Sequence, residues 1–578
     1  MTTPESTRLV IVGGVAGGMS CAARARRLDE SAEIIVLERG AHVSFANCGL
    51  PYFVGGEIAD RDALLVQTPA TLAASLNLDV RTGHDVVAMD AAARTVTVRT
   101  AAGTQMIAYD HLVLSPGASA TRPAIDGIDS PRVHTLRTVD DAVALREGVT
   151  GGAPRAVVLG AGFIGVEAAE ALASAGVRTT LVQSGPHVLA PLERESAWFV
   201  ENELRALGID VRTGTTATAV EHHDAHDTVL LSDGARIDAD LIVLAAGVRP
   251  DTAVFEDAGV ACEHGAMVVD AHGRTNLPAV WAVGDATVSV DAVTGIHRPV
   301  ALAGPANRAG RLIADAIFRP ERARPVTATL GTAIIRVGRL AAAMTGANRA
   351  SLESAGIPYR TLHLHPNQHA GYFPGADAVH LVVHIADDGR LLGAQAVGTE
   401  GADKRIDVLA TAIRAGLHVD DLIDLDLAYS PPYGQAKDAV NLIGMVGENV
   451  QNGTLALWYA DDLDEVRAHA LILDTRRDDE VATGMLPEAL HIPHTQLRAR
   501  MDEVRDAAAG RPVRVMCASG VRSAIAHRQL VQAGFDSASL SGGMQTLRSV
   551  LGDRAPDTLV AGMAPALPGP HEMEEKAA

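Results

Sequence analysis

Two glycine loops, which begin at Gly13 and at Gly160, constrain the fold of this 578-residue chain more than any other feature. Each loop follows a short apolar run, at residues 9–12 and 156–159, and each precedes a helix-forming segment. A strand that turns through glycines into a helix points backbone N–H groups and the positive helix end at a pyrophosphate. The sequence therefore predicts two dinucleotide-binding βαβ units, between whose cofactors electrons would pass.

The two loops differ in how well they match the spacing G-x-G-x-x-G. The loop at residues 160–165 has every glycine, whereas Val15 stands at the middle glycine position of the first loop. A second apolar run after the first loop ends at Glu38, whose carboxylate can accept hydrogen bonds from a ribose. The imperfect loop alone fits an ordinary glycine turn equally well, but its strand, helix and acid favour nucleotide binding.

Charge and cysteine content exclude several other classes of protein. The net charge of −21 disfavours nucleic acid and anionic membranes as partners, and no apolar run approaches the ~20 residues of a membrane span. The N-terminus does not resemble a signal peptide. The four cysteines, at positions 21, 48, 262 and 517, form no C-x-x-C pair, so neither a metal site nor a disulfide framework is predicted. A cytoplasmic protein is expected.

Three further segments resemble the FAD-binding elements of the pyridine nucleotide-disulfide oxidoreductases. They are S-F-A-N-C-G-L-P-Y at residues 44–52, S-P-G-A at 115–118 and V-G-D at 283–285, and the resemblance extends over about residues 8–450. Within the family, residues 44–52 are most similar to the coenzyme A disulfide reductases. The resemblance implies FAD at the first loop and NADH or NADPH at the second.

The same resemblance implies which residues contact each cofactor, with Asp285 at the ribityl or phosphate part of FAD. Those implied for FAD are Gly13, Gly14, Val15, Ala16, Gly18, Glu38, Arg39, Asn47, Ala118, Gly284, Asp285 and Ala303. Those implied for the pyridine nucleotide are Gly160, Gly162, Phe163, Ile164, Gly165, Glu167 and Gly247. The strand after the second loop ends at Gln183 and Ser184, which are neither acidic nor basic, so the choice between NADH and NADPH stays open.

Cys48 is the candidate redox residue. A cysteine taken at random is more often buried and inert, but the resemblance places Cys48 at a helix N-terminus beside the flavin, where a low pKa and access would make it reactive. Dithiol members of the family have a second cysteine five positions away, where this chain has Val43 and Phe53. An intramolecular disulfide is therefore excluded, and we expect Cys48 to cycle through a mixed disulfide, a persulfide or a sulfenic acid.

Related NADH oxidases and peroxidases carry a histidine in the first loop, where this chain has Ala16. This difference favours a small-molecule sulfur substrate, although an NAD(P)H oxidase or peroxidase that uses a Cys48 sulfenic acid remains the alternative. A redox-sensing scaffold without turnover is a further alternative, which the complete second loop disfavours. The resemblance also implies coenzyme A as substrate or bound ligand, held by Arg27, Ser44, Asn47 and Lys437. From the residues alone, Arg27 would be a solvated arginine on a helix face.

Residues from about 331 to 447 have an α+β pattern, and two segments there resemble active-site segments of the family's dimerisation domain. They are H-A-G-Y-F-P-G at residues 369–375 and Y-S-P-P-Y at 429–433. The resemblance implies a homodimer in which Tyr372 and Tyr429 reach the cysteine of the partner subunit. Packing in an interface explains each tyrosine equally well when it is considered singly.

The C-terminal part of the chain contains a second candidate nucleophile, Cys517. A strand at residues 513–516 runs into C-A-S-G-V-R-S and then into a helix. Backbone N–H groups of such a loop stabilise a thiolate or persulfide anion, and Arg522 adds positive charge. The loop resembles the active site of rhodaneses, and it is shorter than the C-x5-R loop of protein phosphatases, which favours sulfur transfer over phosphate chemistry. A docking or regulatory domain is the alternative.

The predicted fold class is α/β, with two Rossmann-like dinucleotide-binding domains, an α+β dimerisation domain and a C-terminal α/β rhodanese domain. Residues 445–461 are expected to form a linker. The predicted function is reduction of CoA disulfide, CoA persulfide or polysulfide through FAD and Cys48, with sulfur transfer by Cys517. The expected boundaries are 1–150 and 270–328 for FAD, 151–269 for NAD(P)H, 329–450 for dimerisation, 463–556 for the rhodanese domain and 557–578 for a disordered tail.

Overall fold

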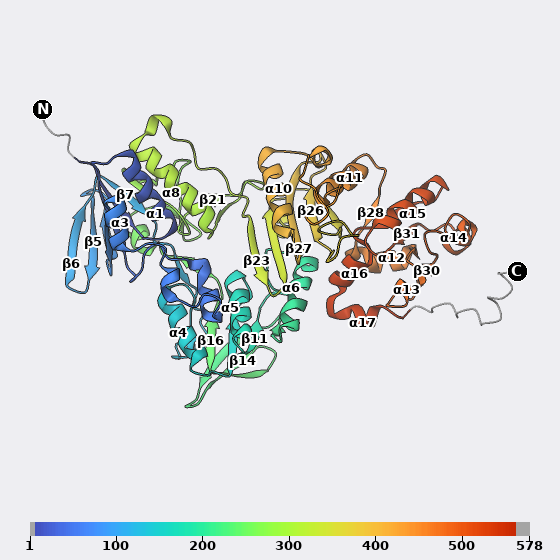
Figure 1. Cartoon of the computed structure of the whole chain (residues 1–578), viewed down its shortest axis with the longest axis horizontal. Coiled ribbons are helices and arrows are strands. Elements are labelled where there is room, and N and C mark those ends of the chain that lie inside the picture. The colour runs from blue at the N-terminus through green and yellow to red at the C-terminus, as the bar shows by residue number, and fades with distance from the viewer. Residues whose placement is uncertain (1–5, 562–578) are drawn as a thin grey trace. The chain divides into compact units, whose positions relative to one another are not determined.

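A computed structural model of the chain describes residues 6–561, and its internal contacts divide the chain into two units (Figure 1). The first unit comprises Met1–Ala190 and Glu203–Gly331, and the second comprises Pro191–Asn202 and Thr332–Ala578. None of the helices among the described residues has the length and apolar character that a membrane crossing requires.

The first unit begins with a parallel five-stranded sheet in the order β20-β7-β1-β2-β3, with the strand before the first glycine loop in its centre. Strand β1 pairs with β2 on one side and with β7 on the other, and β20 returns from far along the chain. The strands are β1 (Arg8–Val12), β2 (Glu33–Glu38), β3 (Asp79–Thr82), β7 (His111–Leu114) and β20 (Val280–Ala282). Helices α1 (Ala16–Leu28) and α8 (Ala303–Phe318) pack together so closely that a Cβ on Gly310 would lie 2.1 Å from the Gly17 carbonyl oxygen.

A second five-stranded parallel sheet repeats this plan in the order β12-β11-β10-β16-β9. Strand β10, which leads into the second glycine loop, is again central, between β11 and β16. The elements are β9 (Val133–His134), β10 (Arg155–Leu159), α5 (Phe163–Ser174), β11 (Arg178–Val182), β12 (Asp210–Arg212) and β16 (Leu241–Leu244). Two antiparallel sheets accompany them: β4 (Asp85–Asp90), β5 (Thr95–Thr100) and β6 (Gly103–Ala108), and β13 (Ala217–His222), β14 (Asp227–Leu231) and β15 (Arg236–Ala239). The prediction of two Rossmann-like domains is confirmed.

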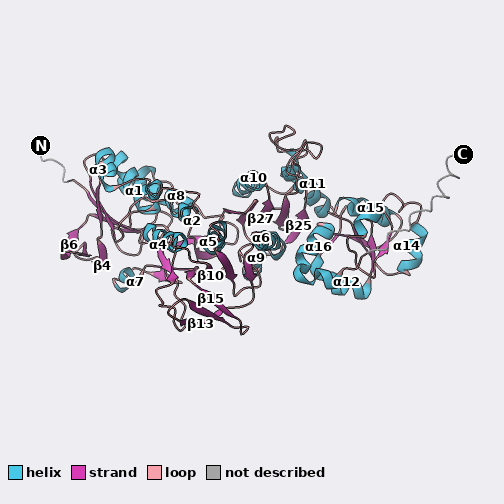
Figure 2. Cartoon of the chain, turned by 60° about the horizontal axis from the view of Figure 1, so that its bottom comes forward, coloured by secondary structure: helices cyan, strands magenta, loops and turns pink. Residues whose placement is uncertain are grey.

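The second unit contains an antiparallel sheet in the order β23-β24-β27-β26-β25, followed along the chain by a parallel sheet in the order β28-β32-β31-β29-β30. The antiparallel sheet comprises β23 (Ala333–Val337), β24 (Leu340–Gly346), β25 (Arg360–Leu364), β26 (His380–Ile385) and β27 (Leu391–Gly398), and α10 (Ala402–Ala415) packs on it. The parallel sheet comprises β28 (Leu457–Trp458), β29 (Leu471–Asp474), β30 (Leu490–His491), β31 (Val513–Met516) and β32 (Ser537–Leu540). Figure 2 shows helices α12 (Leu463–His469), α14 (Met501–Ala508), α15 (Val521–Gln532) and α16 (Gly543–Leu551) around these strands.

The linker expected at residues 445–461 is wrong, because most of these residues belong to regular elements. Helix α11 (Ala439–Gln451) contains residues 445–451, and β28 pairs with β32 in the parallel sheet. Of the glycine and asparagine residues that suggested a linker, Gly447 and Asn449 lie within α11, and Asn452 and Gly453 form the turn after it. The predicted disordered tail also cannot begin at residue 557, since helix α17 (Ala555–Thr558) includes this residue and Val560 pairs with Met485. Residues 562–578 lie outside the described part of the chain.

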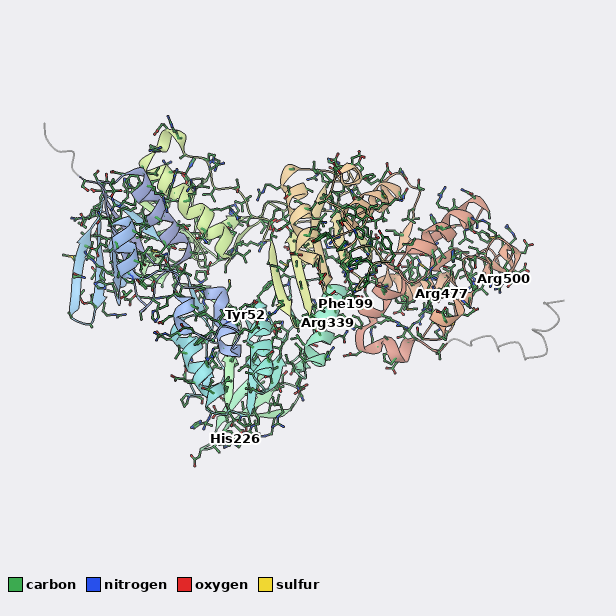
Figure 3. The ribbon with its side chains drawn as sticks, in the orientation of Figure 1. Tyr52, Phe199, His226, Arg339, Arg477 and Arg500 are labelled. Atoms are coloured by element: carbon green, nitrogen blue, oxygen red, sulfur yellow. The ribbon has the colours of Figure 1, made fainter. Side chains whose placement is uncertain are left out.

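A buried polar network joins the two sheets of the second unit. The Nδ1 atom of His363, in β25, lies 2.7 Å from the Ser541 Oγ atom, directly after β32. The Nε2 atom of the same ring lies 2.8 Å from a carboxylate oxygen of Glu195, at the start of α6 (Arg194–Ala206). Phe199 of the same helix, labelled in Figure 3, stacks on His380 with ring centroids 3.7 Å apart. The C-terminal domain is therefore held against its neighbour by satisfied buried hydrogen bonds.

Candidate active sites

Steric crowding explains the glycines of the first loop. A Cβ on Gly13 would lie 1.9 Å from the Ser115 carbonyl oxygen, and a Cβ on Gly18 would lie 2.0 Å from the Gly13 carbonyl oxygen. Gly13 also has φ of +97°, in the region that favours glycine. The imperfect position, Val15, has φ of −113°, which any residue adopts, so valine preserves the turn. Gly14, Val15 and Ala16 thus lie in the backbone turn that leads into α1.

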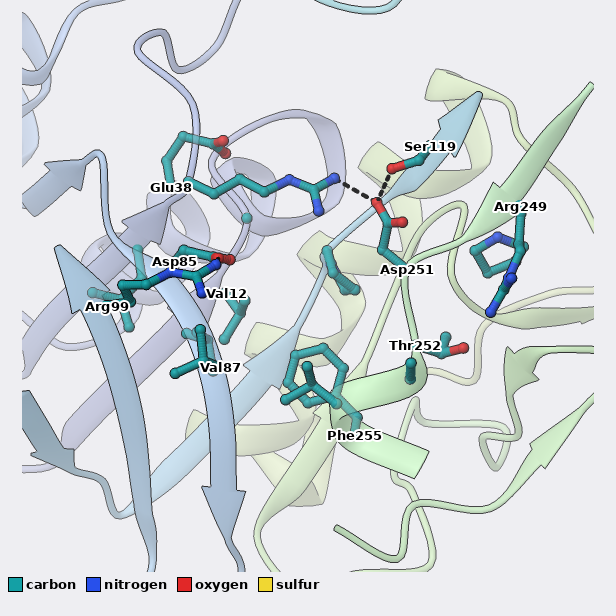
Figure 4. A pocket seen from close by; sticks show the side chains of 18 of the residues that line it. Val12, Glu38, Asp85, Val87, Arg99, Ser119, Arg249, Asp251, Thr252 and Phe255 are labelled. Carbon is teal, nitrogen blue, oxygen red and sulfur yellow. Dashed lines mark hydrogen bonds and ion pairs between the residues drawn. The ribbon is translucent and has the colours of Figure 1, made fainter. Parts of the chain in front are cut away.

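A cavity of about 760 Å³ lies beside this loop, in the first unit (Figure 4). Glu38 at the end of β2 lines it, and its carboxylate accepts hydrogen bonds from the N–H groups of Gly14, at 2.8 Å, and Gly40, at 2.7 Å. The adjacent Arg39 donates to Asp251, which also accepts a hydrogen bond from the Ser119 hydroxyl at 2.9 Å (Figure 4). A cavity of this size with oriented polar groups fits a nucleotide.

The remaining residues implied for FAD come from several elements of the same unit. Ala118 begins β8 (Ala118–Ala120), Ala303 begins α8, and Gly284 follows β20 with φ of +87°. The Asp285 carboxylate lies 3.6 Å from Arg137, and burial raises the pKa of Asp285 while the arginine lowers it. Arg137 was not predicted, since nothing in its sequence context marks it. The cofactor contacts of all these residues stay predictions.

The second loop is crowded in the same way on one side and open on the other. A Cβ on Gly160 would lie 2.3 Å from the Ala245 carbonyl oxygen, and one on Gly165 only 1.8 Å from the Gly160 carbonyl oxygen, whereas one on Gly162 meets nothing within 4 Å. Phe163 and Ile164 begin α5, and Gly247 has φ of +99°. The open side leaves room for the approach of a pyrophosphate.

At the position that would distinguish NADH from NADPH, the side chain of Gln183 hydrogen-bonds within the protein. The Gln183 side-chain oxygen accepts a hydrogen bond of 2.9 Å from the backbone N–H of Ala161. Its amide is therefore oriented by the glycine loop and presents no charge to a 2′-phosphate.

Cys48 lies in a short 3-10 helix, Asn47–Gly49, that continues into α2 (Leu50–Gly55), and its side chain is exposed. The Ser44 N–H donates to the Gly14 carbonyl oxygen at 2.8 Å, which fixes this segment against the first glycine loop. Helix α2 packs on α5, so Glu167 of the nucleotide-binding helix lies near the thiol. Within this chain, protein atoms that partly enclose the thiol raise the pKa of Cys48, the charge of Glu167 raises it further, and a backbone hydrogen bond opposes both, so the low pKa implied beside the flavin stays a prediction.

The four residues implied for CoA do not form one site within the first unit. Ser44 and Asn47 flank Cys48, but Arg27 is exposed on α1 and donates to the Ala23 carbonyl oxygen of its own helix at 2.8 Å. Lys437 is exposed in the second unit.

The two tyrosines implied for the dimer site lie together in the second unit. The hydroxyl oxygens of Tyr372 and Tyr429 are 3.3 Å apart, and the two side chains are 77% and 48% exposed. Phe373 and Tyr433, from the same two segments, are also exposed. The four rings leave an aromatic surface on this unit.

Cys517 follows β31 and is almost completely buried. Its Sγ atom accepts a hydrogen bond from the Gly520 N–H at 3.2 Å. The single proton of the Ser523 hydroxyl is shared between this sulfur, at 3.4 Å, and the Gly520 carbonyl oxygen, at 3.0 Å. The Ser539 hydroxyl donates to the Ser523 oxygen at 2.9 Å, which orients Ser523 from the sheet. Of the backbone N–H groups predicted to surround the sulfur, that of Gly520 donates to it, and the Ser523 side chain adds a second donor.

Arg522 has a partner that the sequence did not reveal. Both terminal nitrogens of its guanidinium donate to the Glu480 carboxylate, each at 2.6 Å. Glu480 belongs to α13 (Asp478–Val481), and it is one of three consecutive acidic residues in the first turn of this helix. Acidic residues are common in the first turn of helices. No signal in the sequence therefore connects this acid with Arg522.

Comparison with known proteins agrees with this architecture. The family model for pyridine nucleotide-disulphide oxidoreductases matches residues 7–310, which is more than half of the chain. The chain belongs to this family. The family's dimerisation domain matches residues 332–440, and the rhodanese-like domain matches residues 455–549. Membership in this family implies FAD and a pyridine nucleotide as cofactors, and their placement at the two glycine loops stays a prediction.

Relatives within the family include proteins with and without the C-terminal domain. The chain is 34% identical to a coenzyme A disulfide reductase of Staphylococcus haemolyticus over 76% of this chain and 98% of the relative. It superposes on the reduced CoADR-RHD of Bacillus anthracis with a TM-score of 0.93 and 37% identity, covering 96% of this chain and 99% of that one. An NAD-dependent persulfide reductase from A. fulgidus gives 0.88 and 36%, covering 93% and 100%.

Proposed function

We propose that the chain is a homodimeric NAD(P)H-dependent reductase of CoA disulfide, CoA persulfide or polysulfide, with Cys48 as redox thiol and Cys517 as sulfur carrier. The observation that supports this most is the presence of two dissimilar thiol sites, one exposed beside the nucleotide loops and one buried in a donor cradle. The names of the relatives point to the same substrates. We expect the enzyme in the cytoplasm, where thiols stay reduced.

When bound, FAD accepts a hydride equivalent from NAD(P)H and supplies two electrons to a thiol–disulfide centre. The Cys48 thiolate attacks one sulfur of the substrate disulfide, so that a protein–substrate disulfide forms and a free thiolate leaves. Two electrons then break this mixed disulfide, and the second thiolate departs. Neither Val43 nor Phe53 can replace the substrate as partner of Cys48. Cys21 cannot either, because complete burial raises the pKa of its thiol to about 12.

We propose that Tyr372 and Tyr429 act on the Cys48 of the partner subunit. Their exposed hydroxyls can donate a proton to a leaving thiolate or orient its carrier. Arg27, Ser44, Asn47 and Lys437 would hold CoA in the dimer, the arginine and lysine through its phosphates.

We expect NADH and NADPH both to be used, because Gln183 neither repels nor binds a 2′-phosphate. The ratio of the two kcat/KM values should stay below ~100-fold, which corresponds to ~2.7 kcal/mol. Steady-state kinetics with both nucleotides measures this ratio, and a larger preference would reveal a determinant elsewhere.

The substrate proposal is tested by comparing CoA disulfide, CoA persulfide, polysulfide and oxygen as acceptors. Purified protein should be yellow, and Cys48→Ser should keep the flavin but lose reduction of all three sulfur acceptors. The matched control is Cys262→Ser, a half-buried cysteine outside both sites, which should keep full activity. Full activity of Cys48→Ser would refute the proposal, and oxygen consumption stoichiometric with NADH would favour an oxidase.

A further inference from the structure

The charge of the Cys517 loop depends on Glu480, which lies 42 positions before Arg522 in the sequence. Both terminal guanidinium nitrogens of Arg522 donate to this carboxylate, at 2.6 Å each, although Arg522 also interacts with Cys517. Both side chains are only about one-fifth exposed, so solvent screens the pair incompletely. Two parallel hydrogen bonds between arginine and carboxylate form the geometry that holds such pairs most firmly.

The position of Glu480 is fixed independently of Arg522. Its carboxylate also accepts a hydrogen bond of 2.9 Å from the backbone N–H of Arg477, which caps α13. The Arg477 side chain, labelled in Figure 3, donates two hydrogen bonds to Asp479, and its Nη1 atom lies 3.5 Å from the Glu480 carboxylate, farther than the two Arg522 nitrogens. Arg522 and the Arg477 backbone both lower the pKa of Glu480, so the carboxylate is charged at neutral pH.

The rest of the loop offers no further positive charge and has an apolar rim. Between Cys517 and Arg522 lie only Ala, Ser, Gly and Val, and Val521 is 68% exposed. One turn farther along α15, Ile525 is 47% exposed. Once Glu480 neutralises Arg522, the loop from Cys517 to Arg522 has no uncompensated cation, and the two aliphatic side chains on the helix after it are exposed.

We propose that Glu480 is a specificity-determining residue, which neutralises Arg522 and so selects persulfides with an uncharged organic arm over the dianion thiosulfate as sulfur donors. The proposal rests on the proposed function and narrows the substrate class of its second thiol. A persulfide brings one negative charge and an arm that can contact Val521 and Ile525. Thiosulfate brings two negative charges and no apolar surface, and it needs a free cation to approach a thiolate.

Both reactions balance without an added oxidant or reductant. With a persulfide R–S–S⁻, the Cys517 thiolate attacks the terminal sulfur, the S–S bond of the donor breaks, R–S⁻ leaves, and Cys517 becomes the persulfide anion. With thiosulfate, the same attack releases sulfite. The two donors differ by one negative charge. Glu480 controls the opposing charge, because it neutralises Arg522.

The test compares sulfur transfer from thiosulfate and from pantetheine persulfide to cyanide, catalysed by the full-length holoenzyme without NAD(P)H. In Glu480→Gln, the ratio of kcat/KM for thiosulfate to kcat/KM for pantetheine persulfide should rise at least tenfold, or ~1.4 kcal/mol. Asp464→Asn, which removes an exposed acid of α12 in the same domain that pairs with Arg467, should leave the ratio within twofold. An unchanged ratio in Glu480→Gln, including an equal loss with both donors, would overturn the proposal.

A second measurement needs no substitution. If Glu480 neutralises the loop, thiosulfate turnover by the unsubstituted enzyme should stay constant or rise with added NaCl, because salt screens repulsion from an acidic protein. Turnover that falls with salt would show that a free cation recruits the dianion and would overturn the proposal. Reduction of CoA disulfide with NADH, assayed in the same preparation, tests the proposed function separately. If this reduction fails, the ratio of the two sulfur donors at Cys517 can still be measured.

Discussion

Cys48 and Cys517 both lie where an extended segment turns into a helix, yet their surroundings are opposite. Cys48 is exposed, and the nearest identified charge is the acid Glu167. Cys517 is 1% exposed, accepts two hydrogen bonds at sulfur and lies beside an arginine. The position of a cysteine before a helix therefore does not by itself determine its reactivity.

This difference fits a division of labour between the two thiols. An exposed thiol can accept a bulky disulfide, whereas a cradle of donors stabilises a sulfur anion that must persist between two reactions. The three following predictions test whether the surroundings of each cysteine matter as described.

The largest effect is expected from Gly543→Ala. A Cβ there would lie 2.6 Å from the Cys517 carbonyl oxygen and 2.8 Å from the Ala518 carbonyl carbon, so the loop must shift. Sulfur transfer from pantetheine persulfide to cyanide should fall at least 100-fold, or ~2.7 kcal/mol. Gly534 also has a positive φ, +87° against +63° at Gly543, but a Cβ there meets no atom within 4 Å, so Gly534→Ala should lose less than threefold. Equal losses in the two variants would show that backbone strain alone, rather than the loop geometry, is responsible.

A smaller effect is expected from Ser523→Ala, which removes the hydroxyl that donates to the Cys517 sulfur. A hydrogen bond to a charged acceptor contributes ~1.5 kcal/mol, so the rate of sulfur transfer should fall about tenfold. Ser549→Ala is the matched control, because this buried hydroxyl donates to the Thr546 carbonyl oxygen within α16. Stopped-flow measurement of Cys517 persulfide formation gives both rates. An unchanged rate in Ser523→Ala would show that the Ser523 hydroxyl does not stabilise the sulfur of Cys517.

The smallest effect concerns the pH dependence of Cys48. Because the charge of Glu167 raises the pKa of this thiol, Glu167→Gln should lower it, and the thiolate should form at lower pH. The pH midpoint for alkylation of Cys48 by iodoacetamide should fall by less than ~1 unit, whereas Glu321→Gln, in the 3-10 helix after α8, should not move it. A midpoint that rises or stays constant would contradict the assigned cause.

Local patterns were sufficient to predict both strand–glycine turn–helix units, because a few adjacent residues determine such a turn. Cys48 was singled out by a family resemblance, and the roles of Cys48 and Cys517 stay predictions. Glu480 and Arg137 were missed, since their partners lie 42 and 148 positions away and charged surface residues are common. The linker was wrong because residues 445–451 continue helix α11 and β28 pairs with β32, and both depend on tertiary packing, which composition does not encode. Val15 departs from the glycine motif, but its φ of −113° is negative, so this position does not need glycine for its φ.

The central claim, that the two thiols perform separate steps, is tested most directly by Cys517→Ser. Steady-state NADH oxidation should be measured with preformed CoA disulfide and, in parallel, with pantetheine persulfide. The account predicts that turnover with CoA disulfide stays within twofold of the unsubstituted enzyme, because this substrate needs only Cys48, while turnover with pantetheine persulfide slows at least fivefold. A collapse of CoA disulfide turnover would place Cys517 inside the reductase cycle and contradict the account.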